Sequence, residues 1–254
     1  PWLGWGWGEL DYAHFMTLYP GERFCDILDN AHNLPLHLAV ELGVPFALTV
    51  CGGLMWVVVR SRPWRETDPT RQLAWGVLAV IALHSLLEYP LWYGPFQMAA
   101  LLSIGLLCKF IPKNAPVALV KSTLVATICI ALIAWAGFDY WRVSQLYLSA
   151  SARSPAYQEK TFDKVRGSRI FSNQVAFAEF TTTALTPHNA QALHSMGLQL
   201  LHFSPEPRVV EKVITSAEML GLEDEAASYR VRYRAAFPDA YVRWMSDSAQ
   251  DEAP

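Results

Sequence analysis

Charged side chains are scarce in this sequence. Asp, Glu, Lys and Arg make up 17% of the 254 residues and hydrophobic residues 52%, whereas soluble domains carry about 25% charged residues. No cluster of Lys and Arg suited to a nucleic acid is present and the net charge is −3, which argues against nucleic-acid binding. The apolar excess is concentrated between residues 34 and 138, and this distribution predicts a membrane protein.

Cysteine pairs and an initiating methionine are also missing. The four cysteines, Cys25, Cys51, Cys108 and Cys129, form no C-x-x-C pair. We therefore predict no disulfide framework and interpret them as small buried hydrophobic residues. The chain begins with Pro1, inside an aromatic-rich motif, which suggests the C-terminal part of a longer protein.

Four apolar stretches are candidate membrane spans, at about 34–59, 72–92, 96–111 and 117–138, because about 20 apolar residues cross the hydrocarbon core. Short loops rich in Lys and Arg stay in the cytoplasm. That rule applies to the loop with Arg60, Arg62, Arg65 and Arg71 and to the loop with Lys109 and Lys113. Residues 1–33 and everything after residue 140 should then face outward from a membrane that the chain crosses several times; in a Gram-negative cell that membrane is the inner membrane and that side is the periplasm.

The sequence after Tyr140 has helical periodicity but no run long enough to span a membrane. Candidate helices cover 173–185, 189–203, 207–220 and 223–237, and prolines punctuate them. We predict an all-α protein in three parts. These are a periplasmic active-site loop at 1–33, a membrane domain of about four helices at 34–139, and a soluble periplasmic domain of helical hairpins at 140–254.

The opening W-L-G-W-G-W-G allows two interpretations. Tryptophans commonly form an aromatic belt at the membrane interface. Alternatively, these rings line a substrate groove and stack on sugars. The two interpretations are compatible.

Histidine and glutamate recur four residues apart within the apolar region. His37 with Glu41 and His84 with Glu88 are each expected on one helix face. An ionisable residue in a membrane span is costly and marks a functional path by default. Antiparallel spans would bring both pairs to one depth, below the loop with His32, and this predicts a shared polar pocket.

Each histidine–glutamate pair could instead be a purely structural hydrogen bond. A metal site is a further alternative, although no H-x-x-x-H or H-x-H spacing supplies ligands.

Two motifs carry a resemblance to a known family. His32 and Asn33, then nine residues, then Gly43 and V-P-F resemble the histidine motif of the O-antigen ligase superfamily, with Phe46 departing from its last position. L-P-L-H-L-A-V-E-L-G and H-S-L-L-E-Y-P-L-W-Y resemble the protein O-oligosaccharyltransferase branch, the pilin-glycosylation ligases. The similarity covers about residues 1–110.

The resemblance implies a reaction and a set of site residues. An oligosaccharide would pass from an undecaprenyl-pyrophosphate carrier in the membrane lipid to a Ser or Thr hydroxyl of a pilin or another periplasmic protein. The family's essential histidine corresponds to His32, and its implicated tyrosine to Tyr89, with Tyr93 second. We predict as catalytic residues His32, Tyr89, Glu88 and His84. We predict as substrate-binding residues Asn33, Arg23, His37, Glu41 and Tyr93, with Arg23 a candidate for the pyrophosphate. No metal or cofactor is expected.

Other functions remain open from the sequence. An O-antigen ligase with a lipid A core acceptor, or an O-antigen polymerase, would share the donor and the pocket. A non-catalytic transporter or scaffold would use the ionisable residues to line a permeation path. In a further alternative, residues 140–254 form a docking module for pilin or an assembly partner.

Overall fold

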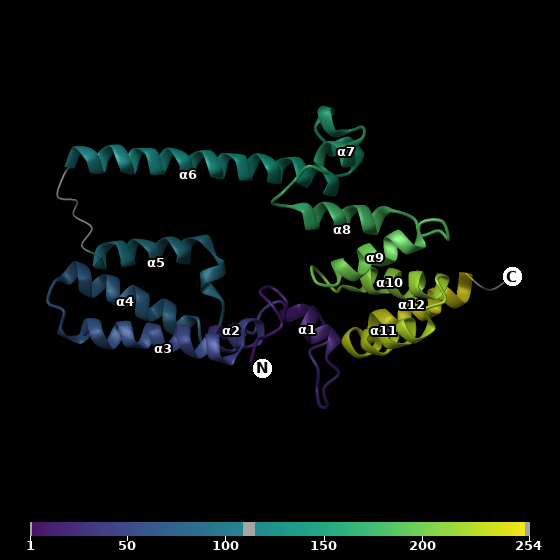
Figure 1. Ribbon diagram of the computed structural model, residues 1–254, viewed down its shortest axis with the longest axis horizontal. Coiled ribbons are helices and arrows are strands. Elements are labelled where there is room, and N and C mark those ends of the chain that lie inside the picture. The colour runs from purple at the N-terminus through teal and green to yellow at the C-terminus, as the bar shows by residue number, and fades with distance from the viewer. Residues whose placement is uncertain (1, 109–114, 252–254) are drawn as a thin grey trace. The chain divides into compact units, whose positions relative to one another are not determined.

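The computed structural model describes residues 2–108 and 115–251, and every regular element in this described part is helical (Figure 1). This confirms the all-α prediction. The chain divides into two compact units. The first comprises Pro1–Thr17 with Ile27–Ile111, and the second Leu18–Asp26 with Pro112–Pro254. The predicted loop with Lys109 and Lys113 lies outside the described residues.

The first unit contains short helices around two longer ones. Its elements are α1 (Leu10–Met16), α2 (Leu34–Leu42), α3 (Val44–Ser61), η1 (Pro63–Arg65), α4 (Pro69–His84), η2 (Pro90–Trp92) and α5 (Gly94–Leu107). The helix starts follow from local chemistry. Asn33 and Asp68 accept backbone N–H hydrogen bonds as N-caps of α2 and α4, and a proline follows in the first turn of each.

Gly43 separates α2 from α3, so the predicted span at 34–59 is two helices. Its φ of +88° and ψ of 156° lie in a region that essentially only glycine adopts. The opening segment of the chain fits against this break. Trp5 N–H donates to Val40 O at 3.0 Å and Gly6 N–H to Glu41 O at 2.8 Å. A Cβ on Gly43 would lie 2.2 Å from Trp2 O, so this close approach requires a glycine.

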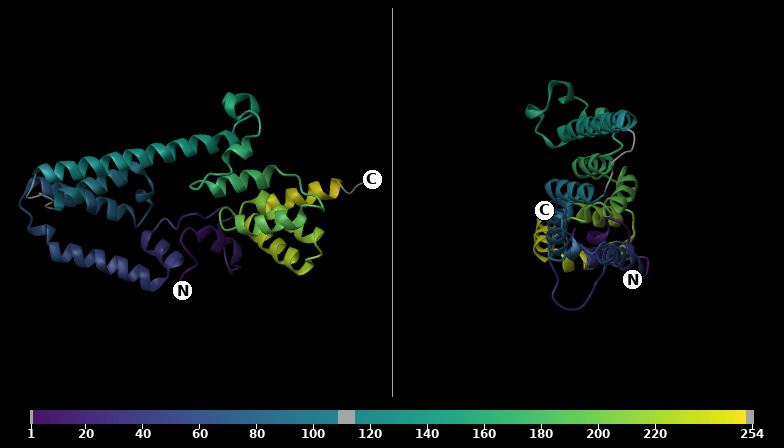
Figure 2. Two further views of the ribbon diagram at one scale, coloured as in Figure 1. Left: turned by 45° about the horizontal axis from the view of Figure 1, so that its top comes forward. Right: turned by 90° about the vertical axis from the view of Figure 1, so that its left-hand side faces the viewer.

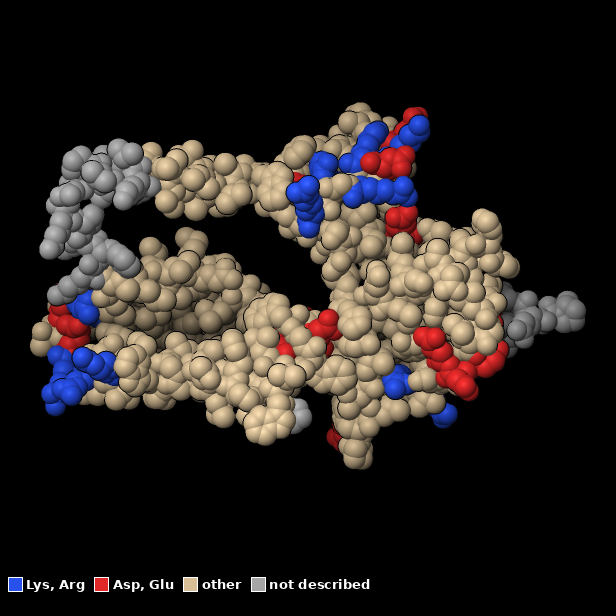
Figure 3. Space-filling model, viewed as in Figure 1, with Lys and Arg blue, Asp and Glu red and all other residues tan. Residues whose placement is uncertain are grey.

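The helices α4 and α5 pack against each other as a short antiparallel hairpin. At its base Arg71 donates to Leu107 O at 2.9 Å and pairs with Glu66 at 2.7 Å. Arg71 thereby satisfies a carbonyl at the end of α5 that has no partner within the helix. Exposed Lys and Arg side chains gather near this base, at the turn between α3 and α4 (Figure 3).

Two helical segments in the described part are long and apolar enough to cross a membrane, Val44–Arg65 and Thr123–Tyr147. The predicted count of about four spans is therefore wrong. At 1.5 Å per residue the 16 residues of α4 and the 14 of α5 measure about 24 and about 21 Å, less than the core of about 30 Å. α4 stops at His84 because the chain turns there, with Leu87 N–H donating to His84 O.

The cysteines are not buried as predicted. Cys25, Cys108 and Cys129 are exposed and Cys51 is half-buried. Cys51 and Cys129 lie in the two long apolar helices, whose side chains face lipid in a membrane, so their hydrophobic character does not imply burial within the chain.

Most of the second unit consists of the long helix α6 (Ala115–Ser144) followed, after short turns, by a group of helices (Figure 2). These elements are η3 (Gln145–Tyr147), η4 (Ala150–Ala152), η5 (Pro155–Tyr157), α7 (Thr161–Val165), α8 (Ser172–Thr182), α9 (Ala190–Leu200), α10 (Pro207–Met219), α11 (Glu223–Ala236) and α12 (Pro238–Asp251). The four helices predicted between residues 173 and 237 are present.

Helix α10 lies at the centre of this group and contacts α8, α9, α11 and α12. Its inner face is fully buried and consists of Val209, Val210, Val213, Ile214 and Ala217. Such burial of aliphatic side chains is the main stabilising contribution of a helical core. Lys212 adds a polar contact, because its Nζ donates to Phe180 O at 2.6 Å and Thr183 O at 2.9 Å at the end of α8.

Candidate functional site

The start of α2 meets a turn formed by residues 85–93, here named the site turn. Leu34 N–H donates to Ser85 O at 2.8 Å, and the Asn33 side-chain amide donates to Leu86 O at 2.9 Å. Asn33 also accepts from Leu36 N–H at 3.0 Å. It therefore caps α2 with its oxygen and binds the site turn with its nitrogen.

His32 and Glu88 form a hydrogen-bonded pair where these two segments meet, and the pair becomes an ion pair when the imidazole is protonated. His32 Nδ1 lies 2.8 Å from Glu88 Oε2, and both side chains are about half exposed, at 52% and 51%. His32 has a φ of +49°, which is uncommon for a residue other than glycine. The side-chain oxygen of the buried Asn30 accepts a hydrogen bond from His32 N–H at 2.9 Å and stabilises this backbone turn. An exposed ion pair on a tightly specified backbone can reach a substrate while keeping its geometry.

Two tyrosines of the site turn stand next to the ion pair. The Tyr89 ring meets the His32 ring edge-on, with centroids 4.9 Å apart, and the Tyr93 ring stacks on Tyr89 at 5.6 Å. Hydrogen bonding to Tyr93 raises the pKa of the Tyr89 phenol above its usual value. The Tyr89 hydroxyl is thus engaged by Tyr93 in a contact that favours its protonated form.

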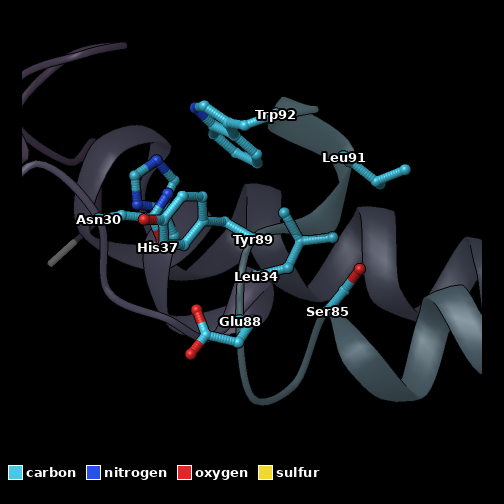
Figure 4. Close-up of a pocket in the computed structure, with 8 residues that line it drawn as sticks. All are labelled: Asn30, Leu34, His37, Ser85, Glu88, Tyr89, Leu91 and Trp92. Atoms are coloured by element: carbon cyan, nitrogen blue, oxygen red, sulfur yellow. The ribbon is translucent and has the colours of Figure 1, made fainter. Parts of the chain in front are cut away.

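A second ionisable pair lies buried behind the first. His37 Nε2 is 3.4 Å from Glu41 Oε1, and the two side chains are 4% and 2% exposed. The indole of Trp92 meets the His37 ring edge-on at 5.2 Å. A small cavity of about 10 Å³ lies beside them, lined by Asn30, Leu34, His37, Ser85, Glu88, Tyr89, Leu91 and Trp92 (Figure 4). This volume is about that of one water molecule, so a substrate would have to bind outside it, next to the exposed His32.

The double role of Asn33 predicts a graded effect on stability. Asn33→Ser keeps an N-cap oxygen but loses the donor to Leu86 O, so we expect a cost of about 1 kcal/mol. Asn33→Ala loses both contacts and should cost about 1 kcal/mol more. The measurement is thermal unfolding of the purified full-length protein in detergent. Equal losses for the two variants would show that the cap contributes nothing.

Comparison with known proteins identifies the family. Residues 72–251 match the family described as "Virulence factor membrane-bound polymerase, C-terminal". The chain belongs to this family. The General O-oligosaccharyltransferase of Acinetobacter baylyi is 26% identical over 152 residues, which cover 58% of this chain and 26% of that protein. The chain thus spans about a quarter of the length of this relative. No solved structure matches the chain.

These matches confirm the predicted resemblance to the O-oligosaccharyltransferases of the ligase and polymerase superfamily. The family match includes the site turn but begins after His32 and α2. The family is described as membrane-bound, and together with the two long apolar helices this indicates a membrane protein.

The structure brings most of the predicted residues of this family member together. His32, Asn33, Glu88, Tyr89 and Tyr93 lie around the start of α2. His37 and Glu88 line one cavity, but Glu41 and His84 are not among its lining residues, so the pocket predicted to be shared by all four side chains is present only in part. Whether any of these residues binds substrate or takes part in catalysis stays a prediction.

His84 and Arg23 are not part of this group of residues around the start of α2. α4 ends at His84, so His84 and Glu88 do not share a helix face as predicted. The His84 ring instead meets Phe96 edge-on at 5.4 Å. Arg23 belongs to the second unit, where its guanidinium lies 4.9 Å from the centre of the Tyr19 ring. Its role toward the pyrophosphate stays a prediction.

The sequence pattern missed Asn30 and Trp92. Asn30 stands two residues before His32, the spacing at which an Asn side chain commonly accepts a backbone N–H and closes a turn. That signal was available in D-N-A-H-N. Trp92 reads as one more apolar residue of the motif, and no local pattern indicates its contact with His37.

Among the described residues, no three His, Cys, Asp or Glu side chains form a group suited to a metal ion.

Proposed function

We propose that this chain carries the transfer site of a membrane oligosaccharyltransferase. The reaction moves an oligosaccharide from an undecaprenyl-pyrophosphate carrier to a Ser or Thr hydroxyl of a periplasmic protein such as a pilin. The ion pair between His32 and Glu88 carries this proposal, because it joins the two sequence motifs at an exposed surface of the first unit.

The geometry suits general base catalysis. The Glu88 carboxylate accepts from Nδ1–H of His32, and this selects the imidazole tautomer whose Nε2 has a free lone pair. Nε2 takes the proton of the acceptor hydroxyl as its oxygen attacks the anomeric carbon of the donor sugar. The bond from that carbon to the pyrophosphate oxygen breaks, and the lipid pyrophosphate leaves with the electron pair. Glu88 stabilises the imidazolium that forms.

The remaining side chains have supporting roles in this proposal. Tyr89 fixes the orientation of the His32 ring. Asn33 and Tyr93 complete the substrate surface, and the buried His37 and Glu41 form the wall behind it. Neither a metal nor another cofactor is part of the proposal.

The proposal also implies an orientation of the chain in the membrane. The Arg-rich end of α3 faces the cytoplasm by the positive-inside rule, so the opposite end of α3, next to α2, faces the periplasm of the inner membrane. Residues 1–33 form a periplasmic loop, residues 34–139 the membrane domain, and residues 140–254 a soluble periplasmic helical domain. A polyprenyl carrier could then stay in lipid while its sugar reaches His32.

A second candidate function comes from the family description, which names a polymerase. An O-antigen polymerase, like an O-antigen ligase, would use the same donor and the same base but a sugar hydroxyl as acceptor. The Acinetobacter relative is named General O-oligosaccharyltransferase, and that name favours oligosaccharide transfer over polymerisation.

The deciding experiment identifies the acceptor. The full-length protein is expressed in a host that lacks its own enzyme of this family and supplies a lipid-linked glycan and a pilin. Intact mass of the pilin and the length distribution of the lipopolysaccharide are measured with and without expression. We expect a glycan mass on the pilin only with the enzyme. Longer lipopolysaccharide with an unmodified pilin would favour the polymerase or ligase, and no change in either product would overturn the proposal.

A further inference from the structure

The buried pair of His37 and Glu41 is costly for the fold. His37 Nδ1 and Glu41 Oε2 are buried and have no hydrogen-bond partner within the part of the chain that the structure describes. Burying ionisable groups with unsatisfied atoms destabilises a protein, and apolar side chains of similar size often serve stability better. Stability therefore does not explain why these residue types stand here, and each unsatisfied group calls for another explanation.

His37 contacts the site turn through Trp92. The indole meets the imidazole edge-on at 5.2 Å, and Trp7 stacks on Trp92 with centroids 6.5 Å apart. Trp92 is thereby fixed between the buried pair and the opening segment of the chain. Glu41 pairs with the other edge of His37 through Nε2, so the imidazole ring has a defined orientation against the indole.

Trp92 is rigidly connected to the residues that touch His32. It ends the short helix η2, which begins directly after Tyr89. Trp92 N–H donates to Tyr89 O at 3.1 Å and Tyr93 N–H donates to Pro90 O at 3.0 Å. Pro90 is buried and its ring fixes one backbone angle. A displacement of Trp92 would therefore move Tyr89 and Glu88 away from His32.

His37 and the site turn meet at the small cavity, since His37, Glu88, Tyr89 and Trp92 all help to line it (Figure 4). Its volume of about 10 Å³ admits about one water molecule and no larger group. Loss of the contact between His37 and Trp92 would therefore allow only a small shift of these side chains, but a misplacement of about 1 Å is enough to lower a catalytic rate.

We propose that His37, oriented by Glu41, is a positioning residue that acts through Trp92 to set Glu88 and Tyr89 against His32. This inference rests on the proposed function for its kinetic consequences, although the geometry it asserts can be tested separately. His37 and Trp92 are not catalytic residues in this account, because neither touches the reacting atoms. The prediction that His37 and Glu41 bind substrate is replaced here by an indirect role.

The kinetic test compares Trp92→Leu, Trp92→Phe and His37→Gln in the full-length protein reconstituted in lipid vesicles. A misplaced catalytic pair should lower kcat about 10- to 100-fold for Trp92→Leu and His37→Gln, with KM for donor and acceptor unchanged. Trp92→Phe keeps an aromatic edge for His37 and should retain most of the rate. Trp64→Leu is the matched control, because Trp64 is exposed at the far end of α3.

A double variant separates positioning from general damage. In a Glu88→Gln background, Trp92→Leu should cause little further loss, because the two changes remove the same interaction. Additive losses, an increase in KM with kcat unchanged, or a Trp92→Leu rate equal to that of Trp64→Leu would overturn the inference.

A chemical readout needs no transfer activity. Diethyl pyrocarbonate modifies free imidazole nitrogens, and mass spectrometry of the His32 peptide gives the modification rate. In the wild type Glu88 accepts from Nδ1–H, which makes the free Nε2 more nucleophilic, so Trp92→Leu and His37→Gln should both slow modification, as Glu88→Gln does. If the wild type transfers no glycan yet these variants lower the modification rate, the proposed function fails and the positioning stands. If transfer is normal and the rates do not change, the positioning is wrong.

Discussion

Replacing His32 with alanine should abolish glycan transfer by the full-length protein. A positioned general base contributes about 10²- to 10⁴-fold to a rate, and a neutral hydroxyl is a poor nucleophile without one. The measurement is the initial rate of product formation in membranes that contain equal amounts of each variant. Because His32 is half exposed and its contacts are to the site turn, we expect the variant to fold and to insert normally.

Glu88→Gln should lower the same rate less, by about 10²-fold, with the KM values little changed. Glutamine keeps the size of the side chain but removes the charge that selects the His32 tautomer and stabilises the imidazolium. Glu66→Gln is the matched control, because Glu66 forms a comparable ion pair with Arg71 at 2.7 Å at the other end of the α4–α5 hairpin. Equal effects of the two glutamine variants, or a His32→Ala enzyme with normal activity, would refute the assigned chemistry.

The i, i+4 spacing explains why one histidine–glutamate pair could be predicted and the other could not. His37 and Glu41 lie within α2, so helical geometry brings them together. His84 is the last residue of α4, so the spacing no longer describes the geometry beyond it. The partner of Glu88 is His32, 56 residues away. Only the folded chain brings these two side chains together.

Hydropathy has a similar limit. The hydropathy pattern located the apolar stretches, but it does not indicate where a helix ends. It therefore predicted membrane spans at α4 and α5, although both helices are too short to cross the hydrocarbon core. In the second unit the predicted helices α8 to α11 were found close to their expected bounds, because prolines and apolar periodicity mark those ends in the sequence itself. The contacts of the site turn could not be predicted in this way, because they are made with segments that lie far away in the sequence.

Gly43→Ala should be the most disruptive change outside the ion pair. An alanine at this backbone conformation is strained by about 1–3 kcal/mol, and its Cβ would lie 2.2 Å from Trp2 O. The strain can be relieved if the opening segment detaches from α2, which would also remove Trp7 from Trp92. We therefore expect a lower unfolding temperature in detergent together with a loss of transfer of at least about tenfold.

Gly52→Ala provides the control for this change. Gly52 lies within α3, and a Cβ added to it would meet no neighbouring atom within 4 Å. Alanine should therefore be neutral there, or stabilise the helix by about 0.5–1 kcal/mol. If the two alanine variants unfold at the same temperature and transfer glycan equally fast, the opening segment does not bind at the α2–α3 break. If only Gly43→Ala lowers both the unfolding temperature and the transfer rate, the opening segment that packs against Gly43 helps to hold Trp92 in place. It thereby also helps to hold Glu88 against His32.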